Sequence, residues 1–235
     1  MKILAFQGSP RMEKGNTEKI LRAFLEGTCD AGAETETLYL RRMNINPCNG
    51  CFGCWYETPG ECVQKDGMKE VLEKILDSDV LIFATPLYIY NMTAYMKALL
   101  ERFLPLVKPD LIKTPDGLTG HPRRYDKIWR WILISNAGFP EEEHFEPLLH
   151  CFDRISRGFT NQEGFAYIIL KGAGEMLRFG DPKTFEPFFQ AVRDAGREFV
   201  ETGKVSVETK TKVDKPLWEY APKAAYATRE SFKSK

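Results

Sequence analysis

The sequence predicts an α/β fold built on a parallel sheet, and three observations lead to this prediction. Short apolar segments typical of buried strands alternate five times with amphipathic segments typical of helices. Directly after the first apolar segment, a glycine-bearing turn leads into a helix, which gives a strand–loop–helix unit over residues 2–31. Residues 80–103 repeat this arrangement. Strands that alternate with helices in this way are typical of βαβ units and a parallel sheet.

The individual elements follow from hydrophobic periodicity and from the residues that interrupt it. The first strand ends at Gly8-Ser9-Pro10, and Asn16 or Thr17 can cap the helix that follows. The expected strands are 2–7, 34–40, 80–84, 128–135 and 165–170, and the expected helices are 16–31, 66–76, 92–103, 142–157 and 184–201. Residues 104–127 form a long connection with four prolines, and a loop of that length is often functional.

We expect residues 1–203 to form the main domain, with a cysteine-rich loop at 45–65 and an insertion at 104–127. Residues 204–235 form a C-terminal extension that is lysine-rich and weakly patterned. Trp218, Tyr220 and Tyr226 are its candidate anchors. Cys29 and Cys151 fall in helical patterns, and we expect them to be buried structural thiols.

The composition is that of an ordinary globular protein. Apolar residues make up 43% of the 235 residues and charged residues 28%, and Lys+Arg and Asp+Glu both number 33. This balance gives no reason to expect nucleic acid or a membrane surface as a partner. The first apolar run is too short for a signal peptide, and no window resembles a spanning helix. We therefore expect a cytoplasmic protein, in which clustered cysteines bind a metal or act in catalysis.

The loop after the first strand is a candidate phosphate site. A turn with glycine and hydroxyl groups that opens a helix presents backbone N–H groups and the positive end of the helix dipole. The candidate phosphate donors are Ser9, Arg11, Asn16 and Thr17. The loop matches neither G-x-G-x-x-G nor a P-loop, so the common dinucleotide and triphosphate interpretations are weakened. The alternative is an ordinary turn with a capping Asn-Thr pair.

Two further loops follow strands of the same predicted sheet. Ligands of open α/β sheets bind beyond the carboxyl ends of the strands, where the strand order reverses. The loop after the third strand offers flat side chains and backbone amides that suit an isoalloxazine ring, and the loop after the fourth lets the backbone approach a ring edge. Their candidate cofactor-binding residues are Pro86, Leu87, Tyr88, Ile89, Tyr90, Asn91 and Met92 in the first and Asn136, Ala137, Gly138 and Phe139 in the second.

Four of the six cysteines lie within fifteen residues, with the spacing C-x2-C-x2-C-x7-C. They are Cys48, Cys51, Cys54 and Cys62. The three histidines, His121, His144 and His150, have no spacing that indicates a metal site or a catalytic triad.

Together these motifs resemble the NADPH-dependent FMN reductase superfamily of flavodoxin-like proteins, and most closely its iron–sulfur flavoproteins. The resemblance rests on Gly8-Ser9-Pro10-Arg11 with Gly15-Asn16-Thr17, and on the cysteines leading to Lys65-Asp66-Gly67-Met68. It rests also on Thr85-Pro86-Leu87-Tyr88 leading to Lys97-Ala98-Leu99-Leu100-Glu101-Arg102. It covers roughly the first 105 residues. It implies a three-layer sandwich with a five-stranded parallel sheet in the order 2-1-3-4-5, FMN held by the three loops, and a homodimer or homotetramer.

The resemblance offers three interpretations of the four cysteines. In iron–sulfur flavoproteins a compact set of four cysteines holds a [4Fe–4S] cluster, and closely spaced thiolates can wrap one cubane. Zinc also accepts four thiolates. In the third interpretation the loop binds no metal and shapes the flavin site or a subunit contact. Glu101 and Arg102 are expected to form a structural ion pair or a subunit contact.

The functional prediction is an FMN-dependent NAD(P)H oxidoreductase. Reduced nicotinamide or another donor gives electrons to FMN, and a quinone, a ferredoxin or a small acceptor takes them. No side chain is expected to act as a general acid or base. The alternatives are a non-enzymatic iron–sulfur flavoprotein that carries electrons between protein partners, and a sensor whose flavin and thiols report oxidation.

Overall fold

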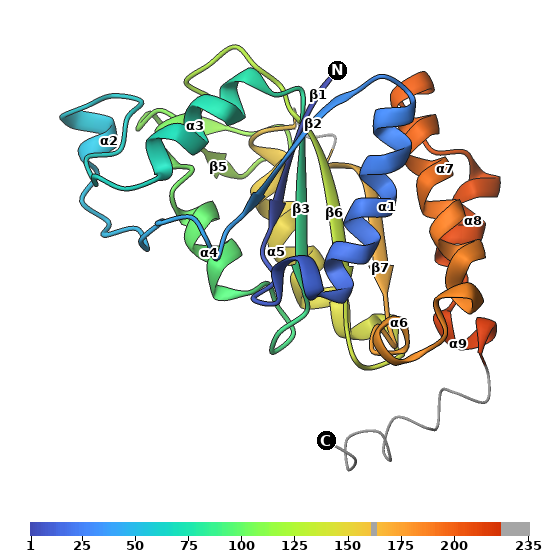
Figure 1. Ribbon diagram of the computed structural model, residues 1–235. Coiled ribbons are helices and arrows are strands. Elements are labelled where there is room, and N and C mark those ends of the chain that lie inside the picture. The colour runs from blue at the N-terminus through green and yellow to red at the C-terminus, as the bar shows by residue number, and fades with distance from the viewer. Residues whose placement is uncertain (161–163, 222–235) are drawn as a thin grey trace.

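The chain folds around a parallel sheet with helices on both faces (Figure 1). The computed structural model describes residues 1–160 and 164–221. Within these residues the main sheet has five strands in the order β2-β1-β3-β6-β7, and every neighbouring pair is parallel. Its strands are β1 (Lys2–Gln7), β2 (Glu34–Tyr39), β3 (Val80–Pro86), β6 (Arg130–Asn136) and β7 (Phe165–Lys171). Because β4 and β5 belong to a separate hairpin, this order is the predicted 2-1-3-4-5 order of a flavodoxin-like sheet, which is thereby confirmed.

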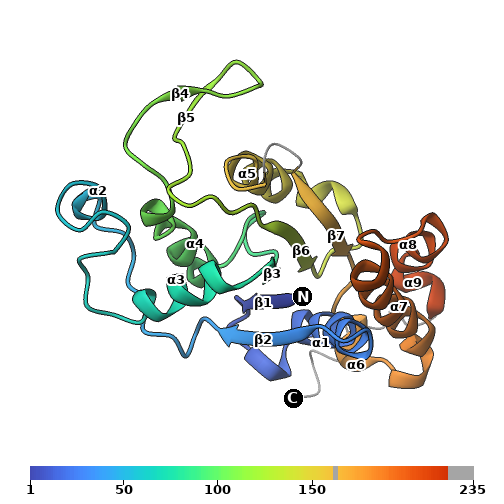
Figure 2. The ribbon, with the colours of Figure 1, turned by 90° about the horizontal axis from the view of Figure 1, so that it is seen from above.

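The helices connect the strands and cover the sheet on its two faces (Figures 1 and 2). One layer holds α1 (Asn16–Asp30) and α7 (Glu186–Thr202), and the other holds α3 (Met68–Asp77), α4 (Ala94–Glu101) and α5 (Glu146–Arg157). The short helices are α2 (Gly53–Tyr56), α6 (Met176–Phe179), and the 3-10 turns η1 (Met12–Lys14), η2 (Leu104–Leu106), η3 (Glu142–Phe145) and η4 (Pro182–Phe185). Each layer buries its own apolar cluster, which is why the central strand β3 is buried along its whole length.

Helices α1 and α7 approach each other unusually closely. A side-chain carbon at Gly196 would lie 2.1 Å from the carbonyl oxygen of Phe24, and one at Gly27 would lie 1.8 Å from that of Arg193. Both positions therefore need glycine, because no other residue leaves room for the neighbouring backbone. This packing fixes α1, whose N-terminus carries the predicted phosphate loop.

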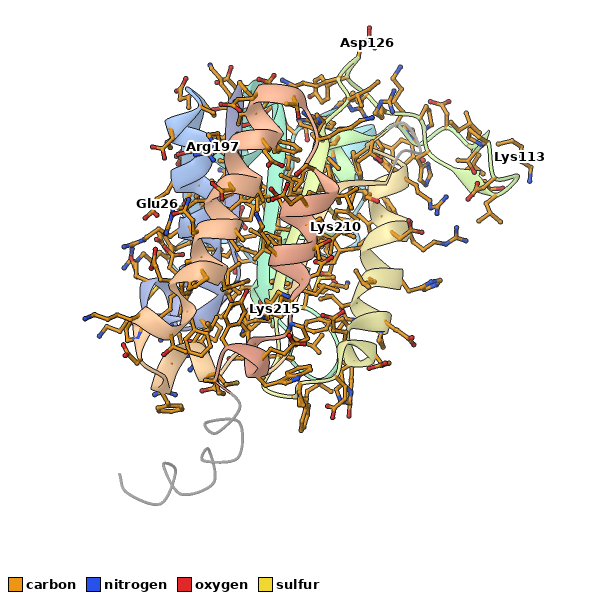
Figure 3. All side chains as sticks on the ribbon, turned by 90° about the vertical axis from the view of Figure 1, so that its right-hand side faces the viewer. Glu26, Lys113, Asp126, Arg197, Lys210 and Lys215 are labelled. Carbon is orange, nitrogen blue, oxygen red and sulfur yellow. The ribbon has the colours of Figure 1, made fainter. Side chains whose placement is uncertain are left out.

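The insertion at 104–127 forms a hairpin that stands away from the body of the molecule (Figure 2). Its strands are β4 (Ile112–Lys113) and β5 (Thr119–Gly120), which pair antiparallel. Figure 3 shows Lys113 on this hairpin, well to one side of the helices that carry Arg197 and Lys210. Alternation and helical periodicity are both absent from so short a hairpin, so the sequence predicted only a long connection.

The C-terminal extension is more ordered than its weak pattern indicated. It forms α8 (Val207–Asp214) and α9 (Leu217–Tyr220), and α8 packs on α7 and β7. Val213 and Leu217 are fully buried in the core, and Trp218 and Tyr220 pack against it as partly buried anchors. The third candidate anchor, Tyr226, lies outside the described residues. None of the described helices is both long and apolar enough to cross a membrane.

Candidate functional site

The first loop and the start of α4 meet where β1 and β3 end, side by side at the centre of the sheet. The backbone N–H of Gly8 donates to the carbonyl of Ala84, and the Thr93 hydroxyl donates to the carbonyl of Gly8, both at 2.8 Å. A side-chain carbon at Gly8 would lie 3.1 Å from Thr93 Oγ1, so the close approach depends on glycine. The sheet order reverses between β1 and β3, which is where open α/β sheets bind ligands.

A buried chain of hydrogen bonds holds the first loop in place. Tyr39 Oη and Gln7 Nε2 both donate to the carboxylate of Glu18, each at 2.9 Å, and Gln7 Oε1 accepts the backbone N–H of Ser9 at 2.8 Å. Burial and the neighbouring Glu18 raise the pKa of Tyr39 to about 12, so its hydroxyl stays a donor. Glu18 is only 5% exposed, and the sequence analysis did not identify it, because its role depends on a partner in β2.

The predicted phosphate loop leaves hydrogen-bond donors at the start of α1. Among the described residues no side chain caps the first turn of this helix, so its backbone N–H groups can serve an anion. Ser9 is buried, and its Oγ accepts the N–H of Arg11 at 3.2 Å, which leaves the hydroxyl hydrogen to donate elsewhere. A side-chain carbon at Gly15 would lie 2.8 Å from Ser9 Oγ, so glycine keeps the turn tight.

Asn16 and Thr17 are buried and join the first loop to two other loops. Asn16 Nδ2 donates to the carbonyl of Gly174 at 2.7 Å, and the Thr17 hydroxyl donates to Asn136 Oδ1 at 2.5 Å. Asn16 Oδ1 is buried and has no partner within the described part of the chain. The structure thus brings together the predicted loops after β1 and β6.

The loop after β7 is a fourth component that the sequence analysis missed. Glu175 pairs with Arg11 at 3.2 Å. A side-chain carbon at Gly174 would lie 2.7 Å from Asn136 Nδ2, so this glycine permits the contact between the two loops. The glycines at 172 and 174, just after a strand, were the available signal, since such positions often mark close backbone approach.

The loop after β3 ends in a tight, strained turn. The N–H of Tyr88 donates to the carbonyl of Asn91 at 2.8 Å, and the N–H of Asn91 donates back at 3.1 Å. Between them Ile89 and Tyr90 have φ values of 47° and 60°, in the left-handed region that a β-branched residue rarely adopts. Such strain costs about 1–3 kcal/mol per residue and is concentrated at functional sites.

The tip of this turn exposes apolar side chains beside the loop after β6. Ile89 is 92% exposed and Phe139 60%. His144, at the start of the next helix, lies between the rings of Phe139 and Tyr90, with centroids 5.0 Å and 5.7 Å away. Pro86 pairs with Asn136 in the ladder, and the N–H of Leu87 donates to the carbonyl of Asn136 at 2.9 Å. The other predicted residues of the two loops, Met92 and Ala137, are buried, and Gly138 is exposed with open space beside it.

These features fit a flavin mononucleotide. The uncapped helix start and the Ser9 hydroxyl suit one phosphate. The exposed flat side chains after β3 and β6 suit a ring system at the same edge.

The cysteine loop lies elsewhere, on the flank beyond α3 and α4 rather than over the strand ends (Figure 1). Cys54 is buried, Cys48 and Cys62 are partly exposed, and Cys51 is exposed. Burial raises the pKa of the Cys54 thiol, and the charges of the other three cysteines raise it further, so all three lie within electrostatic reach of Cys54. The N–H of Gly50 donates to Cys48 Sγ at 3.4 Å.

This donor set fits an iron–sulfur cluster in its chemistry. All four candidate ligands are thiols, and backbone N–H groups that donate to sulfur are typical partners of cluster thiolates. Zinc also accepts four thiolates. Over residues 1–160 and 164–221, no three His, Cys, Asp or Glu side chains lie close enough together to hold a metal ion. The cluster and its ligands remain a prediction.

The expectation of a buried thiol was wrong for Cys29, which is exposed and lies 3.3 Å from the hydroxyl of Thr35. It holds only in part for Cys151, which is partly exposed and packs against the core. Both lie near the edges of their helix faces, which helical periodicity alone does not resolve. Glu101 pairs with Lys97, and Arg102 turns inward to pair with Asp66, so the two residues form no ion pair with each other. A subunit contact by Glu101 stays a prediction.

The comparisons with known proteins agree with this architecture. Residues 1–115 match a family model described as NADPH-dependent FMN reductase. An iron–sulfur flavoprotein of Archaeoglobus fulgidus is 34% identical over 151 residues, which cover 58% of this chain and 67% of the relative. An iron–sulfur flavoprotein of Methanocaldococcus jannaschii is 38% identical over 106 residues, or 45% of this chain. The chain spans only about half, 53%, of this second relative.

Among solved structures, an FMN-dependent NADH-azoreductase from Bacillus anthracis in complex with FMN is similar with a TM-score of 0.59. The match covers 85% of this chain and 97% of that one at 15% identity, which supports the fold alone. The sequence similarity, the sheet order and the converging loops after β1, β3, β6 and β7 lead to one conclusion. The chain belongs to the NADPH-dependent FMN reductase family, with iron–sulfur flavoproteins among its relatives.

Proposed function

We propose that this protein binds FMN at the carboxyl ends of β1, β3 and β6 and acts as an NAD(P)H-dependent oxidoreductase. The family description supports the nicotinamide donor and the flavin. A quinone, a ferredoxin or another small acceptor takes the electrons. When bound, FMN supplies hydride and electron transfer, and the protein supplies binding and orientation.

The residues at the carboxyl ends of these strands have distinct roles in this proposal. The first-turn N–H groups of α1, the Ser9 hydroxyl and the Arg11 guanidinium hold the phosphate. Asn16 and Thr17 join the loops around it. The turn at 88–91 and the loop at 136–139 flank the ring and limit the access of water to it. No side chain is assigned a proton-transfer role.

The observation that carries the proposal is the convergence of separate loops on one point of the sheet. Thr17 on α1 bonds to Asn136 at the end of β6, Asn16 bonds to Gly174 after β7, and Thr93 after β3 bonds to Gly8. An ordinary turn with a capping Asn-Thr pair needs none of these long-range contacts. A binding site needs them, because its donors must be held in place before the ligand arrives.

The test is to purify the protein, record its absorption spectrum and identify the cofactor after denaturation. We expect FMN at a ratio approaching one per chain, and oxidation of NADPH or NADH that depends on added quinone. Release of FAD, or failure to bind FMN after incubation with an excess, would contradict the proposal.

The cysteine loop favours a second candidate function, a one-electron carrier in which a [4Fe–4S] cluster works with the flavin. Four thiols in one loop are more than an FMN reductase requires. Iron and sulfide assays on anaerobically purified protein separate the two candidates. Four irons per chain, with slow turnover of NAD(P)H, would favour the carrier.

A further inference from the structure

The guanidinium of Arg102 is buried at the end of α4, and each of its two terminal nitrogens donates two hydrogen bonds. Nη1 donates to the carbonyl of Asn46 and to Asp66 Oδ2, both at 2.8 Å. Nη2 donates to Asp66 Oδ1 at 3.0 Å and to Cys62 Sγ at 3.2 Å. Arg102 is 1% exposed, so these contacts are made away from solvent. Each terminal nitrogen therefore binds the carboxylate with one N–H and the cysteine loop with the other, whereas Nε is buried without a partner among the described residues.

Asp66 fixes the orientation of this fork. Its side chain is fully buried, and it also accepts the N–H of Asn46 at 3.0 Å and that of Met68 at 3.1 Å. Burial would raise the pKa of Asp66, but the hydrogen bonds from Arg102 and from the two backbone groups lower it to about 2. The pair is therefore ionised at neutral pH, and two parallel hydrogen bonds set the plane of the guanidinium.

The contacts of Arg102 lie at the two ends of the cysteine loop. Asn46 precedes the first cysteine of the loop, and Cys62 is the last. A third contact holds the middle of the loop, because Trp55 Nε1 donates to the carbonyl of Leu104 at 3.1 Å, just beyond Arg102. The loop thus closes on the junction between α4 and η2.

We propose that Arg102 is the positioning residue of the four thiols: it closes the cysteine loop and places a positive charge and an N–H donor against Cys62 Sγ. Lysine cannot replace it, because a single ammonium group cannot hold a carboxylate with two parallel bonds and still reach both ends of the loop. The proposal concerns the loop itself. It stands whether or not FMN binds at the other site, and whether or not the loop holds a cluster.

The test compares two alkylating reagents on the full-length protein after any iron has been removed with a chelator. Iodoacetate is anionic and iodoacetamide is neutral, and peptide mass spectrometry gives the labelling rate of each cysteine. The rate with iodoacetate divided by the rate with iodoacetamide reports the charge beside each sulfur, because a nearby positive charge favours the anionic reagent. We expect Arg102→Met to lower this ratio at Cys62 about fivefold, the factor that one unit charge exerts at about 4 Å in a water-like medium.

Asp66→Asn provides the decisive comparison. It removes the counter-charge and leaves the guanidinium against the sulfur, so we expect the ratio at Cys62 to rise rather than fall. A role that merely kept the loop folded would move both variants in the same direction. Exposed Cys29, on α1, is the internal control, and its ratio should not change.

Lys97→Met is the matched control on the same helix, because Lys97 forms an exposed pair with Glu101. It should leave the labelling of Cys62 unchanged. Where the wild type holds iron, Arg102→Met should lose at least half of it while Lys97→Met keeps it. If Arg102→Met fails to fold, Arg102→Gln, which also removes the charge, and Asp66→Asn carry the test, with the same opposite signs expected. Equal ratios at Cys62 in the wild type and the Arg102 variant, or shifts of the same sign in Arg102 and Asp66 variants, would overturn the proposal.

Discussion

The bond between Thr17 and Asn136 offers a direct test of whether loop convergence holds the flavin. Thr17→Val keeps the shape of the side chain and removes the hydroxyl that donates to Asn136 Oδ1. Both residues are buried, at 1% and 5% exposure, so each single change leaves the other polar group without its partner. Such an unpaired group costs about 1–3 kcal/mol, against a net value of about 0.5–1.5 kcal/mol for the bond itself.

The magnitudes decide the expected pattern. In FMN-free protein, Thr17→Val and Asn136→Ala should each lower the free energy of unfolding by about 1–3 kcal/mol. In the double variant the free energy of unfolding should fall by about 1 kcal/mol less than the sum of the two single effects. The reason is that neither polar group of the pair is then left buried without a partner. For FMN binding, each single variant should raise the dissociation constant about five- to tenfold, since the loops are no longer joined beforehand.

Urea unfolding followed by far-UV circular dichroism gives the stabilities, and quenching of FMN fluorescence gives the dissociation constants. Thr28→Val is the matched control. Thr28 lies buried on the same helix, and its hydroxyl donates to the carbonyl of Leu25 within that helix at 2.8 Å. It should leave FMN binding unchanged. Strict additivity of Thr17→Val and Asn136→Ala, together with an unaltered dissociation constant, would refute the reasoning.

Four further predictions follow from other parts of the molecule. The folded pKa of Asp66, about 2, lies below its ordinary 3.8, so the pair with Arg102 stabilises the fold fully above about pH 4. The difference in urea midpoint between wild type and Asp66→Asn should be constant there and shrink as the pH falls towards 2. Gly196→Ala should lower the free energy of unfolding by about 1–3 kcal/mol through overpacking, whereas Gly138→Ala, with open space around it, should change it little. Serine in place of any one of the four loop cysteines should remove most of the bound iron and leave FMN in place. An unchanged iron content per chain would show that the substituted cysteine is not a ligand. Light scattering at micromolar concentration should show a homodimer or homotetramer, and a flavin-loaded monomer would contradict this.

The sequence determined the strands and their order of appearance because burial on both faces leaves an unmistakable pattern. The run Val80 to Ala84 is continuously apolar, and in the structure β3 lies at the centre of the sheet with helices on both sides. Local signals also located the loops of the candidate site. A glycine turn between a strand and a helix can be read from residues close together in the sequence, as at Gly8 and Gly15.

Only the tertiary structure decided which side chains act together, because their partners are far apart in the sequence. Thr17 and Asn136 are separated by 119 residues, and Arg102 and Asp66 by 36. The sequence placed Arg102 beside Glu101 as a candidate pair, but the helix turns the first inward and leaves the second at the surface. Helical spacing gives the face of a residue, not the loop that comes to lie against it.

The hairpin within 104–127 and the terminal helices α8 and α9 could not be predicted from the sequence, for a related reason. Two-residue strands carry no period, and the hydrophobic pattern of α8 is weak because little of it is buried. Val213 and Leu217 reach the core only because α7 and β7 present a surface for them. A pattern in the sequence records how much of a segment is buried, whereas the fold of the rest of the chain decides what buries it.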